Sequence, residues 1–301
     1  MRQMAIIGAA SGWGSQNPGA EAGPDYLRRR GLVDRLRAAD IDAHWHATVT
    51  TKAPRRTIAK MTREQSFPLV VDHNKRLART LVRTVNGDQL PVVVGGDHAI
   101  AIGTWSAMTA ALGAEGEFGL IWIDAHMDAH TPETADQGKW GGYYHGRPLA
   151  CLLGRGEPEL TQIASPHAKI APQHVSLIGV RSYEAGEAKL LSDLGVQVHH
   201  MREVERRGFA AVFEDARKRA RAAAAGYGVT IDLDGFDPDD APGVGSPESD
   251  GLSAPAVVRS LRGLAADDRF KALEIAEFNP ERDLADATAK LIANLLISLN
   301  S

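Results

Sequence analysis

The stretch Ile121-Trp122-Ile123-Asp124-Ala125-His126-Met127-Asp128 decides the fold of this chain. Its apolar start predicts a buried strand, because a short apolar run with β-branched residues favours that structure. Asp and His follow at positions 124, 126 and 128. Strand side chains alternate between two faces, so extended geometry past Ile123 would bring these three together. Two carboxylates and an imidazole suit a divalent metal, whereas the simpler interpretation is a strand that ends in solvated polar residues.

Two further apolar stretches end in the same residue types. Pro91-Val92-Val93-Val94 leads into Gly95-Gly96-Asp97-His98, and Val229-Thr230-Ile231 leads into Asp232-Leu233-Asp234. The candidate ligands are therefore His98, Asp124, His126, Asp128, Asp232 and Asp234. Six such ligands exceed the needs of one tetrahedral zinc ion. They suit two metal ions about 3.5–4 Å apart, whose charge would also offset the repulsion between buried carboxylates.

Short apolar runs and amphipathic segments alternate along the chain. We expect strands at residues 4–8, 41–46, 91–94, 120–123, 174–180, 196–199, 228–233 and 270–275. We expect helices at 25–39, 62–87, 98–112, 148–153, 184–194, 209–225, from 253 onward and at 284–299. This alternation implies a parallel sheet with helices on both faces. The prediction is a single doubly wound α/β domain, residues 1–301, with its site beyond the carboxyl ends of the strands.

Composition narrows the class of protein. A hydrophobic fraction of 44% and a charged fraction of 24% are ordinary for a globular protein. The net charge of -4 indicates no nucleic-acid or membrane-surface partner, and we interpret Arg28-Arg29-Arg30 and Arg217-Lys218-Arg219 as solvated helix faces. A lone cysteine, Cys151, excludes an intrachain disulfide and is expected to be buried and inert. With no signal peptide or long apolar run, we expect a cytoplasmic protein.

The three strand ends resemble the motifs of the ureohydrolase (arginase/agmatinase) family in order and spacing. The matching segments are Gly95–His98, Asp124–Asp128 and Asp232–Pro238, and His145–Pro148 and Glu277–Pro280 resemble two further family segments. The similarity covers residues 1 to 300 and is closest to arginase. It implies an arginase-like fold, two divalent metal ions (usually Mn²⁺), and hydrolysis of a guanidino compound to urea and an amine.

The resemblance also implies a role for each candidate ligand. The first metal would be held by His98, Asp124, Asp128 and Asp232, and the second by Asp124, His126, Asp232 and Asp234. Asp124 and Asp232 would bridge the two ions, and Asp128 would also hydrogen-bond the attacking hydroxide. Asp97 and Asp237 are expected in turns or behind the ligands.

Two more residues acquire catalytic roles by resemblance. His145 matches a histidine that moves a proton to the leaving amine; the simpler interpretation is a loop histidine without a role. Glu277 matches a carboxylate that orients the guanidinium group; the simpler interpretation is a surface charge at a strand end.

The segment after Asp128 departs from the arginase pattern. His130 stands where arginases commonly have asparagine, and residues 135–144 are more aromatic than usual. These aromatics either narrow the pocket or stack on a cation, or else they pack against their own loop. The substrate-binding residues implied by the resemblance are His130, Glu184, Glu187 and Ser246.

The sequence therefore predicts a manganese-dependent ureohydrolase that converts L-arginine to L-ornithine and urea. A first alternative is a relative that acts on guanidinobutyrate, agmatine or a modified arginine. A more distant alternative is a catalytically silent metal-binding scaffold, although no implied ligand is missing, and neither is His145 or Glu277. The resemblance further implies a homotrimer or homohexamer.

Overall fold

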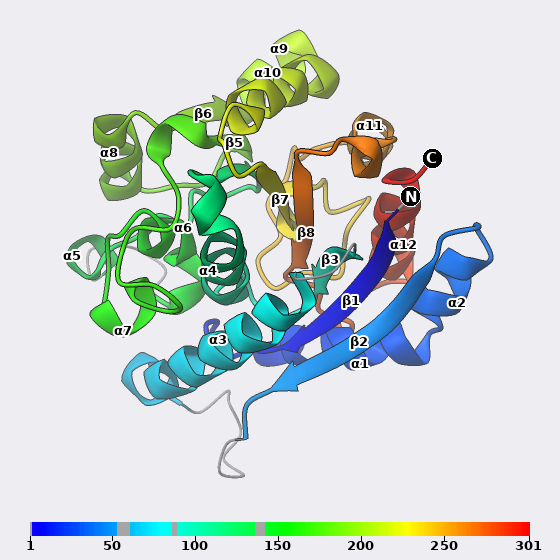
Figure 1. The fold of residues 1–301 in the computed structure, drawn as a ribbon, viewed down its shortest axis with the longest axis horizontal. Helices are drawn as coiled ribbons and strands as arrows, with labels where there is room; N and C mark the ends of the chain where they lie inside the picture. Colours follow the sequence, from blue (N-terminus) through cyan, green and yellow to red (C-terminus); the bar gives the residue numbers. More distant parts are fainter. Residues whose placement is uncertain (1, 53–60, 86–88, 136–141) are drawn as a thin grey trace.

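An eight-stranded parallel sheet forms the centre of the molecule (Figure 1). The computed structural model describes residues 2–52, 61–85, 89–135 and 142–301. The strands are β1 (Gln3–Ala10), β2 (Ala43–Thr50), β3 (Gln89–Val94), β4 (Gly119–Ile123), β5 (Val175–Val180), β6 (Gln197–His200), β7 (Tyr227–Asp232) and β8 (Phe270–Ala276). Their order in the sheet is β2-β1-β3-β8-β7-β4-β5-β6. The predicted single α/β domain with a parallel sheet is confirmed.

Helices cover both faces of the sheet (Figure 1). One face carries α1 (Gly23–Arg29), α2 (Leu32–Arg37), α9 (Met201–Arg207), α10 (Phe209–Arg221), α11 (Ala254–Ser260) and α12 (Ala287–Ser298). The other carries α3 (Arg63–Val85), α4 (Ile100–Leu112), α6 (Pro148–Leu152), α7 (Pro158–Thr161) and α8 (Ala185–Leu194). Short helices are α5 (Pro132–Ala135), η1 (Pro18–Ala22), η3 (Gly113–Glu115), η4 (Tyr144–Gly146), η5 (Pro172–His174), η6 (Leu233–Gly235) and η7 (Leu264–Ala266).

Each face of the sheet has its own hydrophobic cluster. On β4, Ile121 and Ile123 join the cluster beneath α10 to α12, while Leu120 and Trp122 join the one beneath α3 and α4. Alternate side chains of one strand thus enter opposite cores. A strand buried on both sides needs apolar residues at every position, which explains the continuous apolar run in the sequence.

Several element boundaries differ from the sequence prediction, and three of the differences have a clear structural cause. The helix expected at residues 25–39 is divided into α1 and α2, because Gly31 takes a left-handed φ of 70° and ends the first helix. The strand expected at 41–46 continues to Thr50 through pairing with β1. The last helix begins at Ala287, where the Asp283 carboxylate accepts the N–H groups of Thr288 (2.9 Å) and Ala289 (3.1 Å).

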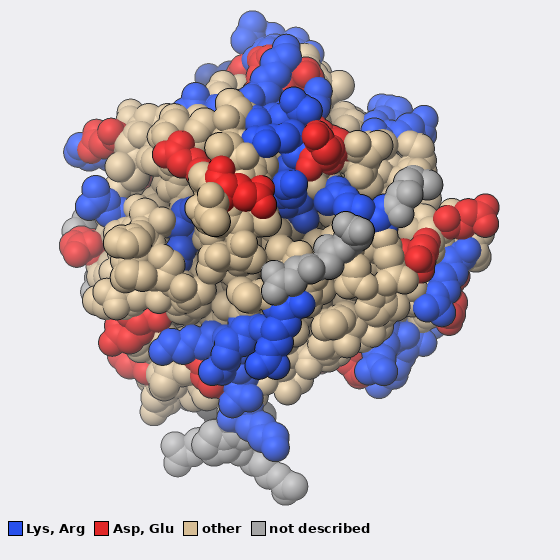
Figure 2. Space-filling view, viewed as in Figure 1, with Lys and Arg blue, Asp and Glu red and all other residues tan. Residues whose placement is uncertain are grey.

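Arginines of α10 form ion pairs or hydrogen bonds with neighbouring segments. Arg217 pairs with Glu214 at 2.8 Å and Asp267 at 3.1 Å. Arg219 donates to the Gly195 carbonyl at 2.8 Å and so joins α10 to the end of α8. On the face shown in Figure 2, basic side chains over α9 and α10 are interspersed with acidic ones. Of the face predicted to be solvated at 217–219, Lys218 is exposed, while Arg217 and Arg219 are half-buried and also connect α10 to its neighbours.

The lone cysteine, Cys151, is buried in α6. Burial raises the pKa of the Cys151 thiol to about 12, so the thiol stays protonated within the core. None of the helices in the described ranges has the length and apolar character needed to cross a membrane.

Candidate metal centre

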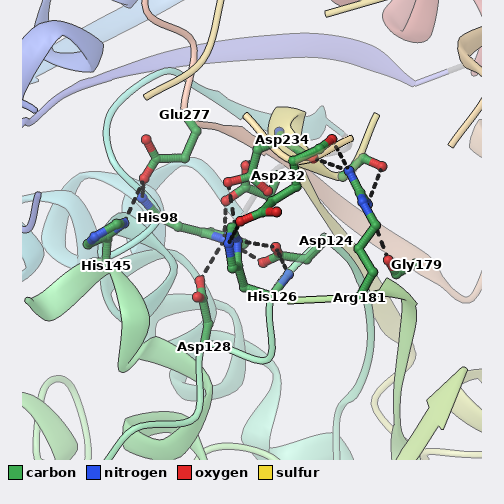
Figure 3. A network of polar contacts seen from close by, with 12 residues as sticks. His98, Asp124, His126, Asp128, His145, Gly179, Arg181, Asp232, Asp234 and Glu277 are labelled. Carbon is green, nitrogen blue, oxygen red and sulfur yellow. Dashed lines mark hydrogen bonds and ion pairs between the residues drawn. The ribbon is translucent and has the colours of Figure 1, made fainter. Parts of the chain in front are cut away.

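Polar side chains gather at the carboxyl ends of the four central strands, β3, β8, β7 and β4 (Figure 3). His98 follows β3, Glu277 follows β8, and Asp232 ends β7. The segment Asp124–Asp128 follows β4. Parallel strands that lie side by side end at the same edge of a sheet, which is where ligands bind in open α/β folds. Residues far apart in the sequence therefore share one site.

Two groups of ligand atoms share Asp124. In the first group, Nδ1 of His98 lies 3.2 Å from Asp124, 3.0 Å from Asp128 and 2.9 Å from Asp232. In the second group, Nδ1 of His126 lies 3.4 Å from Asp124 and 3.3 Å from Asp234. The ligand atoms of each group lie within 4.8 Å of one another. Asp232 belongs only to the first of these groups, although the resemblance implies that it bridges both metals.

The ligands meet through tight turns and not through continued strand geometry. β4 ends at Ile123, the Asp124 carboxylate accepts the N–H of His126 at 2.6 Å, and Asp128 has a left-handed φ of 48°. After β7, the Asp232 carboxylate accepts the N–H of Asp234 at 2.9 Å within η6. A side chain that accepts an N–H two residues ahead forms an Asx turn. The candidate ligands therefore lie together as predicted from strand alternation, but Asx turns and not extended backbone bring them together.

The buried carboxylates of this cluster repel one another, and bound cations would offset their charge. Burial, together with the charges of Asp234 and Asp124, raises the pKa of Asp232 well above its ordinary range. Burial also raises the pKa of Asp128 to about 7, with repulsion from Asp124 as the next cause. Nδ1 of His98 is buried among three carboxylates, and Oδ1 of Asp234 is buried without a hydrogen-bond partner among the described residues. Two divalent cations with oxygen and nitrogen ligands would satisfy these crowded, buried atoms.

The second ring nitrogen of each ligand histidine faces an outer carboxylate. Nε2 of His98 lies 3.0 Å from the Thr230 hydroxyl, which donates to Oε1 of Glu274 at 2.8 Å. Since the Thr230 proton goes to Glu274, the hydroxyl oxygen accepts from Nε2 and leaves Nδ1 of His98 unprotonated toward the cluster. Nε2 of His126 lies 3.6 Å from Oε1 of Glu248.

Thr230, Glu274 and Glu248 were not predicted from the sequence to support the site. Glu274 is fully buried within β8, and Thr230 is fully buried within β7. A charged residue inside an apolar strand is costly without a partner, and that signal could have identified Glu274. Glu248 lies in an irregular loop, where the sequence offers no comparable signal.

Glu277 connects the end of β8 to both His98 and His145. Its Oε1 accepts the backbone N–H of His98 at 2.9 Å and lies 3.5 Å from Nδ1 of His145 (Figure 3). Burial lowers the pKa of His145, but the hydrogen bond to Glu277 and its charge outweigh this effect and raise the pKa to about 9. Glu277 also has a left-handed φ of 66°, a strained conformation that is most frequent at functional sites.

A pocket of about 280 Å³ opens onto the ligand cluster. Its walls include His126, Asp128, His145, Asp232 and Asp234, and also the four residues predicted to bind substrate, His130, Glu184, Glu187 and Ser246. Nε2 of His130 lies 3.2 Å from Oε2 of Glu187 and 3.5 Å from Oε2 of Glu184. Glu187 is also part of the helix start, because its carboxylate accepts the N–H groups of Glu184 and Ala129 at 3.0 Å each. The four predicted residues therefore lie together around one pocket.

The two tyrosines of the aromatic segment have different surroundings. Tyr143 lines the pocket. Tyr144 is buried, and its ring packs between Phe67 at 5.3 Å and the Arg147 guanidinium at 4.9 Å. Tyr143 thus contributes to the pocket wall, and Tyr144 packs against α3 and the Arg147 guanidinium and not against its own loop alone. Trp140 lies outside the described residues.

Further pocket residues that were not named individually from the sequence include Ser15, Gln16, Asn17, Ser182, Tyr183 and Arg282, although the Gly-, Pro- and Ser-rich loop over residues 11–24 is of a kind that often lines sites. Residues 15–17 belong to the loop after β1, which Asp97 holds by accepting the N–H of Gly14 at 3.0 Å. Asp97 is therefore a residue that positions this loop, as its predicted turn role suggested. Arg282 follows β8, five positions after Glu277.

Comparison with known proteins agrees with this geometry. A model of the arginase family matches residues 2–300. The arginase of Bacillus caldovelox is 36% identical over 300 residues, which cover 99% of this chain and 98% of that protein. The arginase of Brevibacillus brevis is 32% identical, with coverages of 99% and 97%.

Solved structures give the same result. The structure of Bacillus caldovelox arginase superposes with a TM-score of 0.90 at 34% identity and covers 100% of this chain and 99% of that one. Proclavaminate amidino hydrolase from Streptomyces clavuligerus shares the fold, with a TM-score of 0.74 at 20% identity, over 99% of this chain and 90% of that one. This chain belongs to the arginase family and is a hydrolase of guanidino C–N bonds.

Proposed function

We propose that this enzyme hydrolyses L-arginine to L-ornithine and urea with the help of two divalent cations. The observation that carries the proposal is the convergence of six candidate ligands with His145 and Glu277 beside one pocket. His98, Asp124, His126, Asp128, Asp232 and Asp234 would hold the cations, and this mixture of carboxylates and imidazoles suits Mn²⁺. When bound, the cations would lower the pKa of a water and supply a nucleophile at neutral pH.

Glu277 and His145 are the residues that we assign to the substrate itself. The Glu277 carboxylate would pair with the planar guanidinium and fix the orientation of its carbon. Hydrolysis joins the oxygen of water to this carbon and breaks the bond from the carbon to the alkyl nitrogen. That nitrogen leaves as an amine and needs a proton, which His145 would deliver.

Urea release after manganese loading tests the proposal. Arginine, agmatine, guanidinobutyrate, guanidinopropionate and free guanidine are compared at equal concentration. Turnover of arginine alone would support the proposal. No urea from any compound, with two metals bound per chain, would contradict it and favour a catalytically silent scaffold.

Asp128→Asn tests the ligand assignment separately from the fold. Asparagine tolerates the left-handed φ of 48° at this position, so the backbone should be preserved. We expect a reduced metal content and a loss of turnover of more than about 100-fold, since a first ligand is removed. Elemental analysis and urea assays give the two readouts. Full activity with two metals bound would refute the assignment.

His130 favours a second candidate, namely activity on another guanidino compound. An imidazole lies in the pocket wall where arginases commonly have an asparagine amide, and it contacts Glu187 at 3.2 Å. His130→Asn should change the order of preference among guanidinobutyrate, agmatine and arginine while metal content stays constant. An unchanged order would remove this residue from the account of specificity.

We further propose a homotrimer or homohexamer that works in the cytoplasm. Both expectations rest on the resemblance to the family. Light scattering should give the mass of three or six chains, and a monomer would contradict the first proposal. Cell fractionation tests the second.

A further inference from the structure

Arg282 places one cation in a pocket that is otherwise rich in carboxylates. Among the described residues that line the pocket, it is the single Lys or Arg. The same walls contain five carboxylates, which come from Asp128, Glu184, Glu187, Asp232 and Asp234. Three of these aspartates belong to the ligand cluster, so bound metal would offset their charge. Arg282 is then the group in this pocket that is suited to an anion.

Backbone contacts hold Arg282 at the pocket wall. Its Nη1 donates to the Gly245 carbonyl at 2.8 Å, with the Val244 carbonyl at 3.5 Å. Gly245 in turn borders Glu277, because a Cβ on Gly245 would lie 3.5 Å from Oε2 of that carboxylate. Gly245 therefore borders two groups: the Glu277 carboxylate, which is proposed to bind the guanidinium, and the Arg282 guanidinium, which donates to the Gly245 carbonyl.

Most of the hydrogen-bonding capacity of Arg282 remains for a ligand. A guanidinium has five N–H donors, and the contacts above involve Nη1 alone. No carboxylate in the described part of the chain forms an ion pair with Arg282, although the side chain is exposed to the pocket. Its neighbour Asp283 is occupied by the start of α12. A guanidinium with a free edge binds a carboxylate in a bidentate manner.

We propose that Arg282 binds the carboxylate of the substrate and restricts the enzyme to guanidino acids. This inference rests on the proposed function and adds a residue to it. Glu184 and Glu187 line the same pocket and suit an ammonium group. L-Arginine carries both groups on one carbon, so Arg282 would contact the carboxylate while these glutamates contact the ammonium.

Three substrates separate these contributions. L-Arginine has a carboxylate and an ammonium, agmatine lacks the carboxylate, and 5-guanidinopentanoate lacks the ammonium. For Arg282→Gln, we expect the ratio of kcat/KM for arginine to that for agmatine to fall about 10- to 100-fold, as for the loss of a charge-assisted bond. The ratio for 5-guanidinopentanoate to agmatine should fall equally. Arg282→Lys should recover part of each ratio, because a point charge remains.

Arg259→Gln is the matched control. Arg259 is an exposed arginine of α11 that does not line this pocket. Its substitution changes the net charge by the same amount and should leave both ratios unchanged. A general electrostatic effect would instead move the ratios equally in both variants and would overturn the proposal.

Binding of the products gives a readout that does not need turnover. Calorimetry with the manganese-loaded protein should show weaker L-ornithine binding in Arg282→Gln and a smaller change for putrescine, which lacks the carboxylate. Equal changes for both products would overturn the role of Arg282. Hydrolysis of agmatine alone by the wild type would also overturn it, while the guanidino hydrolase function would stand. Failure to release urea from any compound would instead contradict the proposed function itself.

Discussion

At the scale of single residues, the same type of turn, an Asx turn, occurs at three places in the site. The carboxylates of Asp97, Asp124 and Asp232 each accept the backbone N–H two residues ahead, at 3.1, 2.6 and 2.9 Å. Each turn lies at or shortly after the carboxyl end of a strand and changes the direction of the chain there. The residue types and their position after apolar runs were visible in the sequence. The turns were not, because an Asp at a strand end is compatible with both extended and turned backbone.

His145→Asn tests the assigned proton transfer. His145 contacts Glu277 and is not part of either ligand group, so metal content should be retained. The variant lacks a group that can carry a proton near neutral pH, and kcat should fall about 100- to 10,000-fold. Steady-state urea assays and elemental analysis measure the two effects. An unchanged kcat would remove His145 from the reaction.

Thr230→Val tests the support behind His98. The variant has nearly the same shape but cannot accept from Nε2 of His98 or donate to Glu274, so the imidazole loses the partner that fixes its tautomer. Manganese affinity, measured by calorimetry, should fall about 10- to 100-fold. Thr230→Ser keeps the hydroxyl and should restore most of it. Equal affinities in the valine and serine variants would rule out this role.

At the scale of elements, the strands were easier to predict than the short helices. Six of the eight strands follow from largely buried apolar runs, whereas the edge strands β2 and β6 are only partly buried and carry a weaker pattern. α7 (Pro158–Thr161) and α9 (Met201–Arg207) were missed, because one or two turns are too short to display a helical period. The break at Gly31 was missed, because the apolar spacing continues across it.

The close contact between α4 and β7 leaves no room for a side chain at Gly228. A Cβ on Gly228 would lie 2.1 Å from Cζ3 of Trp105, which is fully buried. Gly228→Ala should therefore lower the free energy of unfolding by about 1–3 kcal/mol, as expected for an overpacked core. Urea denaturation measures the change.

Gly113→Ala provides the comparison. A Cβ on Gly113 meets no atom within 4 Å, and its backbone is right-handed, with φ of -62°. This substitution should be neutral or raise stability by up to about 1 kcal/mol. If both variants lose a similar free energy of unfolding, the contact with Trp105 is not the cause of the destabilisation by Gly228→Ala.

At the scale of the whole molecule, the site lies between two cores that the sequence could place only in outline. The parallel sheet and its ligand edge followed from the alternation of strands and helices. The spatial order of the strands did not, because pairing between distant segments leaves no local trace in a single sequence. The same holds for pocket residues such as Asn17 and Arg282, which come from separate loops.

Stability at acidic pH should depend on His73 in α3. Burial lowers the pKa of His73 to about 4, whereas an unfolded histidine has a pKa of about 6.5. Between these values the unfolded chain binds more protons, so the free energy of unfolding falls as pH drops from about 6.5 to about 4, by up to about 3 kcal/mol. Above pH 6.5 the ring is neutral in both states.

The variant His73→Leu isolates this contribution. Unfolding free energies of wild type and variant are compared at pH 7.5 and pH 4.5, so that the metal-site carboxylates, common to both, cancel. At pH 4.5 the unfolding free energy of the variant, relative to that of the wild type, should be higher than it is at pH 7.5. If the unfolding free energies of wild type and variant differ by the same amount at both pH values, His73 titrates normally or lies in a more polar environment.

The position of β8 determines when the site can form. β8 is the last strand in the chain, yet it lies between β3 and β7 in the sheet, and Glu277 after it holds the N–H of His98, 179 positions earlier. Without β8, a gap of about 10 Å, two strand spacings, would separate the neighbours that carry His98 and Asp232. A nascent chain therefore cannot bring His98 beside Asp232 until residues near 277 have left the ribosome, whereas Asp124, His126 and Asp234 follow the directly paired strands β4 and β7. Completion of the first group of candidate ligands belongs to the finished polypeptide.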